Sequence, residues 1–208
     1  MQFTPIDLNT WKRKEYFQHY FTEIPCTYSI TVNLDITNII SKKIKIYPAL
    51  LHALAAAVNN HDEFKTTLDE NGNPGIYDIM HPCYTVFNKD TETFTNVWTA
   101  YHKDFKVFYA DYLNDAGLAA NCTKMLAKND TPPNTFPVSM LPWESFTGFN
   151  LNLPKGSSYL LPIFTAGKYF QEGSSYKLPL AVQVHHAVCD GFHVCRLIDE
   201  VKAALQKY

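Results

Sequence analysis

The spacing of apolar residues changes along the chain, and each spacing predicts a different kind of element. From residue 178 to residue 184, apolar side chains alternate with other residues, which is the pattern of a strand with one buried face. Beyond residue 193 the apolar residues recur at the spacing of one helix face, at Val194, Ile198, Val201 and Leu205. Asp190-Gly191 is typical of a turn, so the stretch 184–193, Val-His-His-Ala-Val-Cys-Asp-Gly-Phe-His, is predicted at a strand-to-helix junction.

Strand and helix patterns are interspersed over the remaining chain. Strands are predicted at 25–36, 64–68, 83–87, 94–99, 159–169 and 176–186, and helices at 11–22, 48–60 and 104–120. The first of these helices has Asn9 or Thr10 available as a cap, and the turn-rich residues 129–137 are predicted as a surface loop. The pattern predicts a single domain over residues 1–208, with an α/β two-layer sandwich whose mixed, mostly antiparallel sheet packs against helices.

Composition narrows the classes of function. The 208 residues are 46% hydrophobic and carry a net charge of −2, which predicts a globular fold and gives no basic surface for nucleic acid or anionic membrane. The apolar stretch 49–58 is about half the length that crosses a bilayer, and the first residues do not resemble a signal peptide. Five cysteines are an odd number, and we expect them to be free thiols in the cytoplasm.

The histidine pair at the predicted junction is the candidate for chemistry. Adjacent strand residues point to opposite faces, so His186 is expected to share the face of Val182 and Val184, where an imidazole can stay neutral. A neutral imidazole is a good general base near neutral pH, because its ordinary pKa is about 6.5. Two other interpretations remain open: a structural histidine, or a zinc ligand. The potential zinc ligands are His185, His186, Cys189, His193 and Cys195, but their spacing lacks the paired arms of a structural zinc site.

The string 185–193 resembles, residue for residue, the C-terminal signature of chloramphenicol acetyltransferases. Further strings resemble that family in the same order along the chain, at 11–15, 25–29, 90–94, 138–143, 149–153 and 161–165. The resemblance implies transfer of an acetyl group from acetyl-CoA to the primary hydroxyl of chloramphenicol, which confers antibiotic resistance, without a covalent enzyme intermediate. It also implies a homotrimer with active sites at subunit interfaces, where one chain gives the base and its neighbour much of the acceptor site. Acetyl-CoA would be a co-substrate, with no permanently bound cofactor and no metal.

The resemblance also implies roles for particular residues. His186 matches the family's general base, and Ser139 its oxyanion donor. Asp190 matches an aspartate that pairs with the arginine here numbered Arg13, and Thr165 matches a threonine that helps to hold a water near the intermediate. From the residues alone, Ser139 is an ordinary half-buried strand serine, and only the resemblance gives it a catalytic role. Asp190 could instead orient His186 as in a catalytic triad.

Binding positions are implied in the same way. The acceptor side matches Tyr20, Cys26, Tyr28 and Leu151, and the CoA side matches Tyr47, Trp143, Asn150 and Tyr169. The sequence departs from some members of the family at Pro137, at Leu153 and around Tyr28, so the acceptor affinity is not implied by the match. Cys189 is not expected to carry an acyl group, since the family transfers it directly and apolar neighbours raise the pKa of a thiol.

Two other functions compete with this one. A dihydrolipoamide acyltransferase has the same fold and also uses His-x-x-x-Asp-Gly, with another hydroxyl or thiol acceptor; such chains carry lipoyl segments ahead of the domain, and this sequence is expected to begin at the fold. The other is a non-catalytic module that binds zinc or a small molecule.

Overall fold

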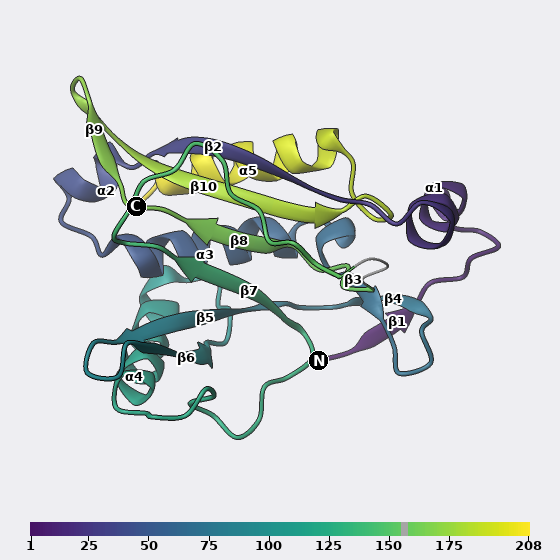
Figure 1. The fold of residues 1–208 in the computed structure, drawn as a ribbon, viewed down its shortest axis with the longest axis horizontal. Coiled ribbons are helices and arrows are strands. Elements are labelled where there is room, and N and C mark those ends of the chain that lie inside the picture. Colours follow the sequence, from purple (N-terminus) through teal and green to yellow (C-terminus); the bar gives the residue numbers. More distant parts are fainter. Residues whose placement is uncertain (155–157) are drawn as a thin grey trace.

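The main sheet of the protein has seven strands among the described residues, which are 1–154 and 158–208 of the computed structural model (Figure 1). In chain order these are β2 (Thr27–Asp35), β5 (His81–Asn88), β6 (Thr93–Trp98), β7 (Thr135–Met140), β8 (Ile163–Ala166), β9 (Phe170–Glu172) and β10 (Ser175–His185). The spatial order is β2-β10-β8-β7-β5-β6, with β9 also paired to β10. The pairs β5–β7 and β7–β8 are parallel and the others are antiparallel, which confirms the predicted mixed, mostly antiparallel sheet.

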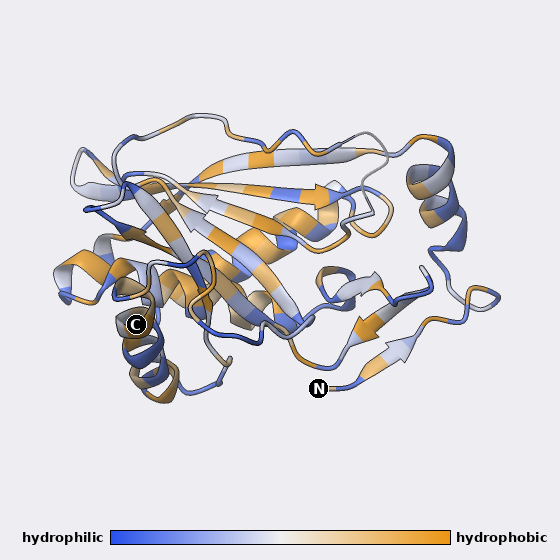
Figure 2. Ribbon diagram, turned by 60° about the horizontal axis from the view of Figure 1, so that its bottom comes forward, coloured by the Kyte–Doolittle hydropathy of each residue, from blue (hydrophilic) through white to orange (hydrophobic). Residues whose placement is uncertain are grey.

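Helices cover one face of this sheet. The long helices are α3 (Ile46–Asn59), α4 (Phe105–Ala120) and α5 (Gly191–Leu205), and shorter ones are α1 (Lys14–Gln18), which continues as a π-helix (His19–Glu23), α2 (Thr37–Ser41) and a 3₁₀ turn (Asp62–Phe64). Helices α3 and α5 lie together behind β10 and β8, and α4 packs on β5 and β6 (Figure 1). On β10 the alternating residues Leu180, Val182 and Val184 are at most 2% exposed, so this face forms the core (Figure 2).

The predicted alternation explains this burial. Even-numbered residues of β10 face the helices, while Ala181 and Gln183 lie on the opposite face of the strand. The buried helix α3 is rich in alanine, so its backbone can approach the sheet and α5 closely. A separate three-stranded sheet, β1 (Phe3–Pro5), β4 (Pro74–Tyr77) and β3 (Thr66–Leu68), contains the hairpin expected around the Asn-Gly turn.

Some predicted boundaries were wrong. Helix α1 begins at Lys14, and neither Asn9 nor Thr10 caps it, because both bond to Asp7 instead. The predicted loop 129–137 ends early, since β7 begins at Thr135. Phe136 packs edge-on against the ring of Phe164 at 5.6 Å and is fully buried, so the burial of one aromatic ring outweighs the turn preference of its proline neighbours.

Other elements carried no sequence signal that we recognised. The short elements β1, α2 and β9 were not predicted, and the strand expected over 159–169 is confined to β8. No helix among the described residues combines the length and the apolar character that crossing a bilayer requires.

Candidate active site

His186 lies in the turn that follows β10, one residue beyond the end of the strand. Its backbone N–H donates to the carbonyl of Cys26 at 2.9 Å. Its imidazole stacks on the ring of Tyr20, with centroids 3.9 Å apart and an interplanar angle of 12°, and meets the ring of Tyr28 edge-on at 5.3 Å. The side chain is 28% exposed. The ring is therefore fixed in orientation and accessible, and it lies between two tyrosines rather than against the helix-facing core that strand alternation predicted.

Arg13 fixes the turn that carries this imidazole. Its guanidinium donates two hydrogen bonds to the carboxylate of Asp190, at 2.7 and 2.6 Å, and two more to the backbone carbonyls of His186 and Ala187, both at 2.9 Å. The side chain of Arg13 is 15% exposed. Hydrogen bonding from Arg13 holds the pKa of Asp190 below its ordinary value, so the carboxylate stays charged. The ion pair expected between Arg13 and Asp190 is present.

Asp190 also approaches the imidazole itself. Its Oδ1 lies 3.2 Å from Nδ1 of His186, although Nδ1 has no aligned hydrogen-bond partner within residues 1–154 and 158–208. The backbone N–H of Asp190 donates to Nδ1 of His193 at 2.9 Å, at the start of α5. Asp190 thus bonds to Arg13 and places its carboxylate beside Nδ1 of His186.

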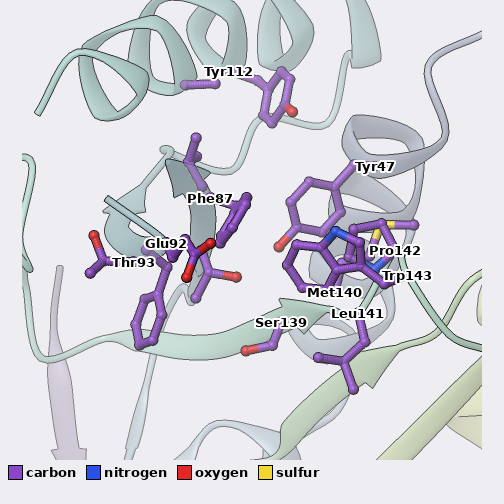
Figure 3. Close-up of a pocket in the computed structure, with 14 residues that line it drawn as sticks. Tyr47, Phe87, Glu92, Thr93, Tyr112, Ser139, Met140, Leu141, Pro142 and Trp143 are labelled. Atoms are coloured by element: carbon purple, nitrogen blue, oxygen red, sulfur yellow. The ribbon is translucent and has the colours of Figure 1, made fainter. Parts of the chain in front are cut away.

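Ser139 lies in a different environment, on the floor of a pocket of about 490 Å³ (Figure 3). The pocket is lined by Tyr47, Thr85, Val86, Phe87, Glu92, Thr93, Phe94, Tyr112, Ala116, Ser139, Met140, Leu141, Pro142 and Trp143. The Tyr47 hydroxyl donates to the carbonyl of Val138 at 3.1 Å, and the ring of Trp143 packs edge-on against Phe87 at 4.7 Å. Burial raises the pKa of Tyr112 to about 12, because the charged phenolate would lose its contact with water in this wall of the pocket.

Thr165 is beside Ser139 in the sheet. The two residues are register partners on the parallel strands β7 and β8, so their side chains are on the same face. Thr165 is 4% exposed. This brings together the two hydroxyl residues that the resemblance implied near the intermediate.

His186 and Ser139 are far apart within one chain. Thr165, opposite Ser139, is itself opposite Ala181 on β10, and His186 is five residues beyond Ala181. At about 3.3 Å per residue along the strand and about 4.8 Å per strand across the sheet, the two lie roughly 15–20 Å apart. A base and an oxyanion donor must both reach one tetrahedral centre at hydrogen-bond distance. One chain does not assemble them into one site.

The implied binding residues divide between these two regions. Tyr20, Cys26 and Tyr28 surround His186 of their own chain, and Leu151 shares with Tyr28 a polar hollow of about 330 Å³. On the CoA side, Tyr47 and Trp143 line the Ser139 pocket.

Two of the implied CoA positions lie elsewhere. Asn150 is in the polar hollow, and Tyr169 packs near Tyr176 at 6.2 Å, outside the Ser139 pocket. The sequence analysis missed Phe87 and Glu92 of that pocket and Gln183 of the hollow. Their strand or turn patterns gave no signal that separates a lining residue from an ordinary surface residue.

Cysteines and histidines do not gather into a metal site in the part of the chain that the structure describes. Cys189 is 1% exposed, and burial raises the pKa of its thiol well above the ordinary value. A buried, protonated thiol is a poor nucleophile, which agrees with the expectation that Cys189 carries no acyl group.

Solved structures with the same fold include two acetyltransferases. A solved chloramphenicol acetyltransferase superposes with a TM-score of 0.81 at 23% identity, covering 98% of this chain and 100% of that one. A dihydrolipoamide acetyltransferase from Azotobacter vinelandii gives a TM-score of 0.68 at 17% identity, covering 87% and 82%. The chain therefore has the fold that these two acetyltransferases share.

Sequence similarity is more specific. The family model for chloramphenicol acetyltransferase matches residues 1–202. Chloramphenicol acetyltransferases from Campylobacter coli and Vibrio anguillarum are each 56% identical to this chain, over 100% of both chains for the first and over 99% and 95% for the second. The chain belongs to the chloramphenicol acetyltransferase family.

Proposed function

We propose that this protein transfers the acetyl group of acetyl-CoA to the primary hydroxyl of chloramphenicol and so confers resistance to the antibiotic. Relatives that are 44–56% identical over nearly the whole chain are chloramphenicol acetyltransferases. The observation that carries the proposal is the accessible imidazole of His186, held by the Arg13–Asp190 pair in a turn whose string matches that family.

The proposed reaction is direct transfer. Nε2 of His186 takes the hydroxyl proton as the hydroxyl oxygen attacks the thioester carbonyl, and the hydroxyl of Ser139 donates to the oxyanion that forms. Collapse of the tetrahedral intermediate breaks the carbon–sulfur bond, and the departing thiolate takes the proton back from the imidazolium. The electron pair that forms the new ester bond thus comes from the acceptor oxygen, and His186 ends the cycle neutral. Thr165 is proposed to hold a water beside Ser139.

The distance between His186 and Ser139 supports an oligomer in which each active site takes His186 from one chain and Ser139 from its neighbour. Such a contact joins two different surfaces, and repeated around an axis it closes a ring. We propose the trimer that the family resemblance implies, with Tyr20, Cys26, Tyr28 and Leu151 on the acceptor side and Tyr47 and Trp143 on the CoA side. The reaction is placed in the cytoplasm, where cysteines stay reduced; all five cysteines are free thiols.

A solved fold relative offers a parallel. In the A. vinelandii dihydrolipoamide acetyltransferase, a serine, a histidine and an asparagine four residues beyond that histidine have been investigated for roles in catalysis. In the present chain, Asp190 stands four residues beyond His186. Dihydrolipoamide is nevertheless the weaker candidate acceptor, because identity to that enzyme is 17% against 56% to chloramphenicol acetyltransferases.

The test uses the purified protein with acetyl-CoA and either chloramphenicol or dihydrolipoamide, and product masses are measured. Acetylated chloramphenicol and one equivalent of free CoA are expected, and a chloramphenicol analogue without the primary hydroxyl should give neither. Acetyl transfer to dihydrolipoamide alone would overturn the proposal. Stoichiometric zinc in purified protein that acetylates neither acceptor would support the competing metal-binding function instead.

A further inference from the structure

Gln183 is a buried polar residue for which the catalytic scheme gives no role. It lies on β10 between Val182 and Val184, on the face of the sheet opposite the helices, and is 5% exposed. Three residues farther along the chain is His186. A buried side-chain amide is costly unless its donors and acceptors find partners, so the partners of Gln183 indicate what it does.

Those partners are mainly the backbone N–H and C=O of one residue in another segment. Oε1 of Gln183 accepts from the backbone N–H of Leu151 at 2.7 Å, and Nε2 donates to the carbonyl of Leu151 at 3.0 Å. Oε1 also accepts from the Ser29 hydroxyl of β2 at 3.3 Å. The amide therefore makes with Leu151 the pair of bonds that a neighbouring strand would make.

The segment that Gln183 holds has no regular secondary structure of its own. The described residues that follow β7, up to residue 154, cross the strands β10 and β2 on the face away from the helices (Figure 1), and residues 150–153 form neither helix nor strand. Among the described residues, this segment also bonds to β2, where the N–H of Phe149 donates to the Thr31 hydroxyl at 3.4 Å. The short pair of bonds from Gln183 is thus the main polar anchor of Leu151.

Leu151 is also a wall of the polar hollow that includes Tyr28, and Tyr28 meets the imidazole of His186 edge-on. We propose that Gln183 is a positioning residue for the acceptor: its side-chain amide holds the Leu151 peptide in the conformation that binds chloramphenicol. The inference rests on the proposed function, because it takes chloramphenicol as the acceptor and Leu151 as part of its site. We call the two bonds between Gln183 and Leu151 the clamp. Without it, the segment must become ordered before chloramphenicol binds, so the apparent affinity for chloramphenicol falls in proportion to the fraction of molecules in which the segment is ordered.

The test replaces Gln183 with methionine, which has a similar size and lacks both bonds. Gln183→Met is expected to raise the KM for chloramphenicol about 10-fold or more, while kcat and the KM for acetyl-CoA each change less than about 3-fold. Thr31→Val is the matched control, because it removes the bond to Phe149 on the same segment and leaves the Leu151 peptide bonded. The control should change the KM for chloramphenicol less than about 2-fold. If Gln183→Met does not fold, Gln183→Asn, whose shorter amide cannot span both atoms of Leu151, gives the same comparison.

Two outcomes would overturn the clamp. An unchanged KM for chloramphenicol is one, and a fall in kcat together with equal rises in both KM values, as general distortion of the site would cause, is the other. Hydrogen exchange at the Leu151 amide separates this inference from the proposed function. That amide should be protected in the wild type and exchange faster in Gln183→Met, whichever acceptor the enzyme uses. Equal exchange in the two proteins would contradict the clamp even if chloramphenicol is acetylated.

Discussion

The turn around His186 is held by charged and polar contacts, whereas the pocket around Ser139 is walled by aromatic and aliphatic side chains. At the turn, the guanidinium of Arg13 alone makes four hydrogen bonds that fix the backbone and Asp190. In the pocket, Phe87, Met140 and Trp143 lie close to Ser139 (Figure 3).

This difference suits the role proposed for each side chain, a general base for His186 and an oxyanion donor for Ser139. A general base must keep one orientation and one tautomer, so a network of fixed charges suits it. A donor to a developing oxyanion gains most where water is excluded and the local dielectric is low, so apolar walls suit it. Each region supplies what the other lacks, and neither alone completes the proposed site.

The largest effect is expected from removing the base. His186→Ala should lower turnover about 10²–10⁴-fold, because it removes the imidazole that is proposed to take the hydroxyl proton. Turnover with acetyl-CoA and chloramphenicol measures it, and circular dichroism checks that the fold is kept. Retention of more than about one-tenth of wild-type turnover would show that His186 is a structural histidine.

The next largest effect is expected from removing the Ser139 hydroxyl in the apolar pocket. Ser139→Ala should lower kcat about 10²–10³-fold and leave both KM values nearly level, because the interaction forms mainly in the transition state. Alanine fills almost the same space, so packing does not imitate this pattern. If Ser139 is only a strand serine, steady-state kinetics will show little change, with about 0.5–1.5 kcal/mol lost from the free energy of unfolding.

A smaller effect is expected from the polar network. Asp190→Asn and Arg13→Val should each lower both activity and the free energy of unfolding, by about 1–3 kcal/mol in stability, since the pair is only partly shielded from water. The double variant should lose less than the sum of the two, as measured by denaturant unfolding of all four proteins. Strict additivity would mean that the ion pair contributes nothing of its own.

The same pair predicts a pH dependence. The pKa of Asp190 is lowered in the folded state, so its stabilising contribution is present above the ordinary carboxyl pKa, about 3.9, and is lost as pH falls through the lower folded value. The stability difference between wild type and Asp190→Asn should therefore shrink in acid. A difference that is constant from neutral pH to about pH 3 would contradict this assignment.

The smallest of these effects tests the pocket wall. Trp143 is 57% exposed and contacts Phe87 at the mouth of the pocket. Trp143→Ala should raise the KM for acetyl-CoA several-fold and leave the KM for chloramphenicol and kcat nearly unchanged. If only the KM for chloramphenicol changed, Trp143 would belong to the acceptor side of the proposed site and not to the CoA side.

Much of this arrangement could be predicted from the sequence, because its signals are local. The alternation before His186 and the helical spacing after it gave β10 and α5 to within a residue or two. The strand holding Ser139 was obscured, since prolines beside Phe136 indicate a loop and only burial against Phe164 makes a strand of it. The role of Gln183 could not be predicted at all. Its partner Leu151 is 32 residues away, in a segment with no periodic pattern.

The bonds of Arg13 to Asp190 span 177 residues, and only the family resemblance pointed to them. The distance between His186 and Ser139 is also beyond sequence reasoning, because it depends on the strand order β10-β8-β7. That distance is the reason for proposing that two chains share each active site.

Co-expression of His186→Ala and Ser139→Ala chains tests this claim most directly. Each variant alone should be almost inactive. In a trimer whose sites lie between chains, each mixed assembly contains one site with an intact His186 facing an intact Ser139. Random assortment of equal amounts then restores about one quarter of wild-type activity. A mixture no more active than the two variants measured separately, in assemblies shown by mass to contain both chains, would mean that each active site is built within one chain.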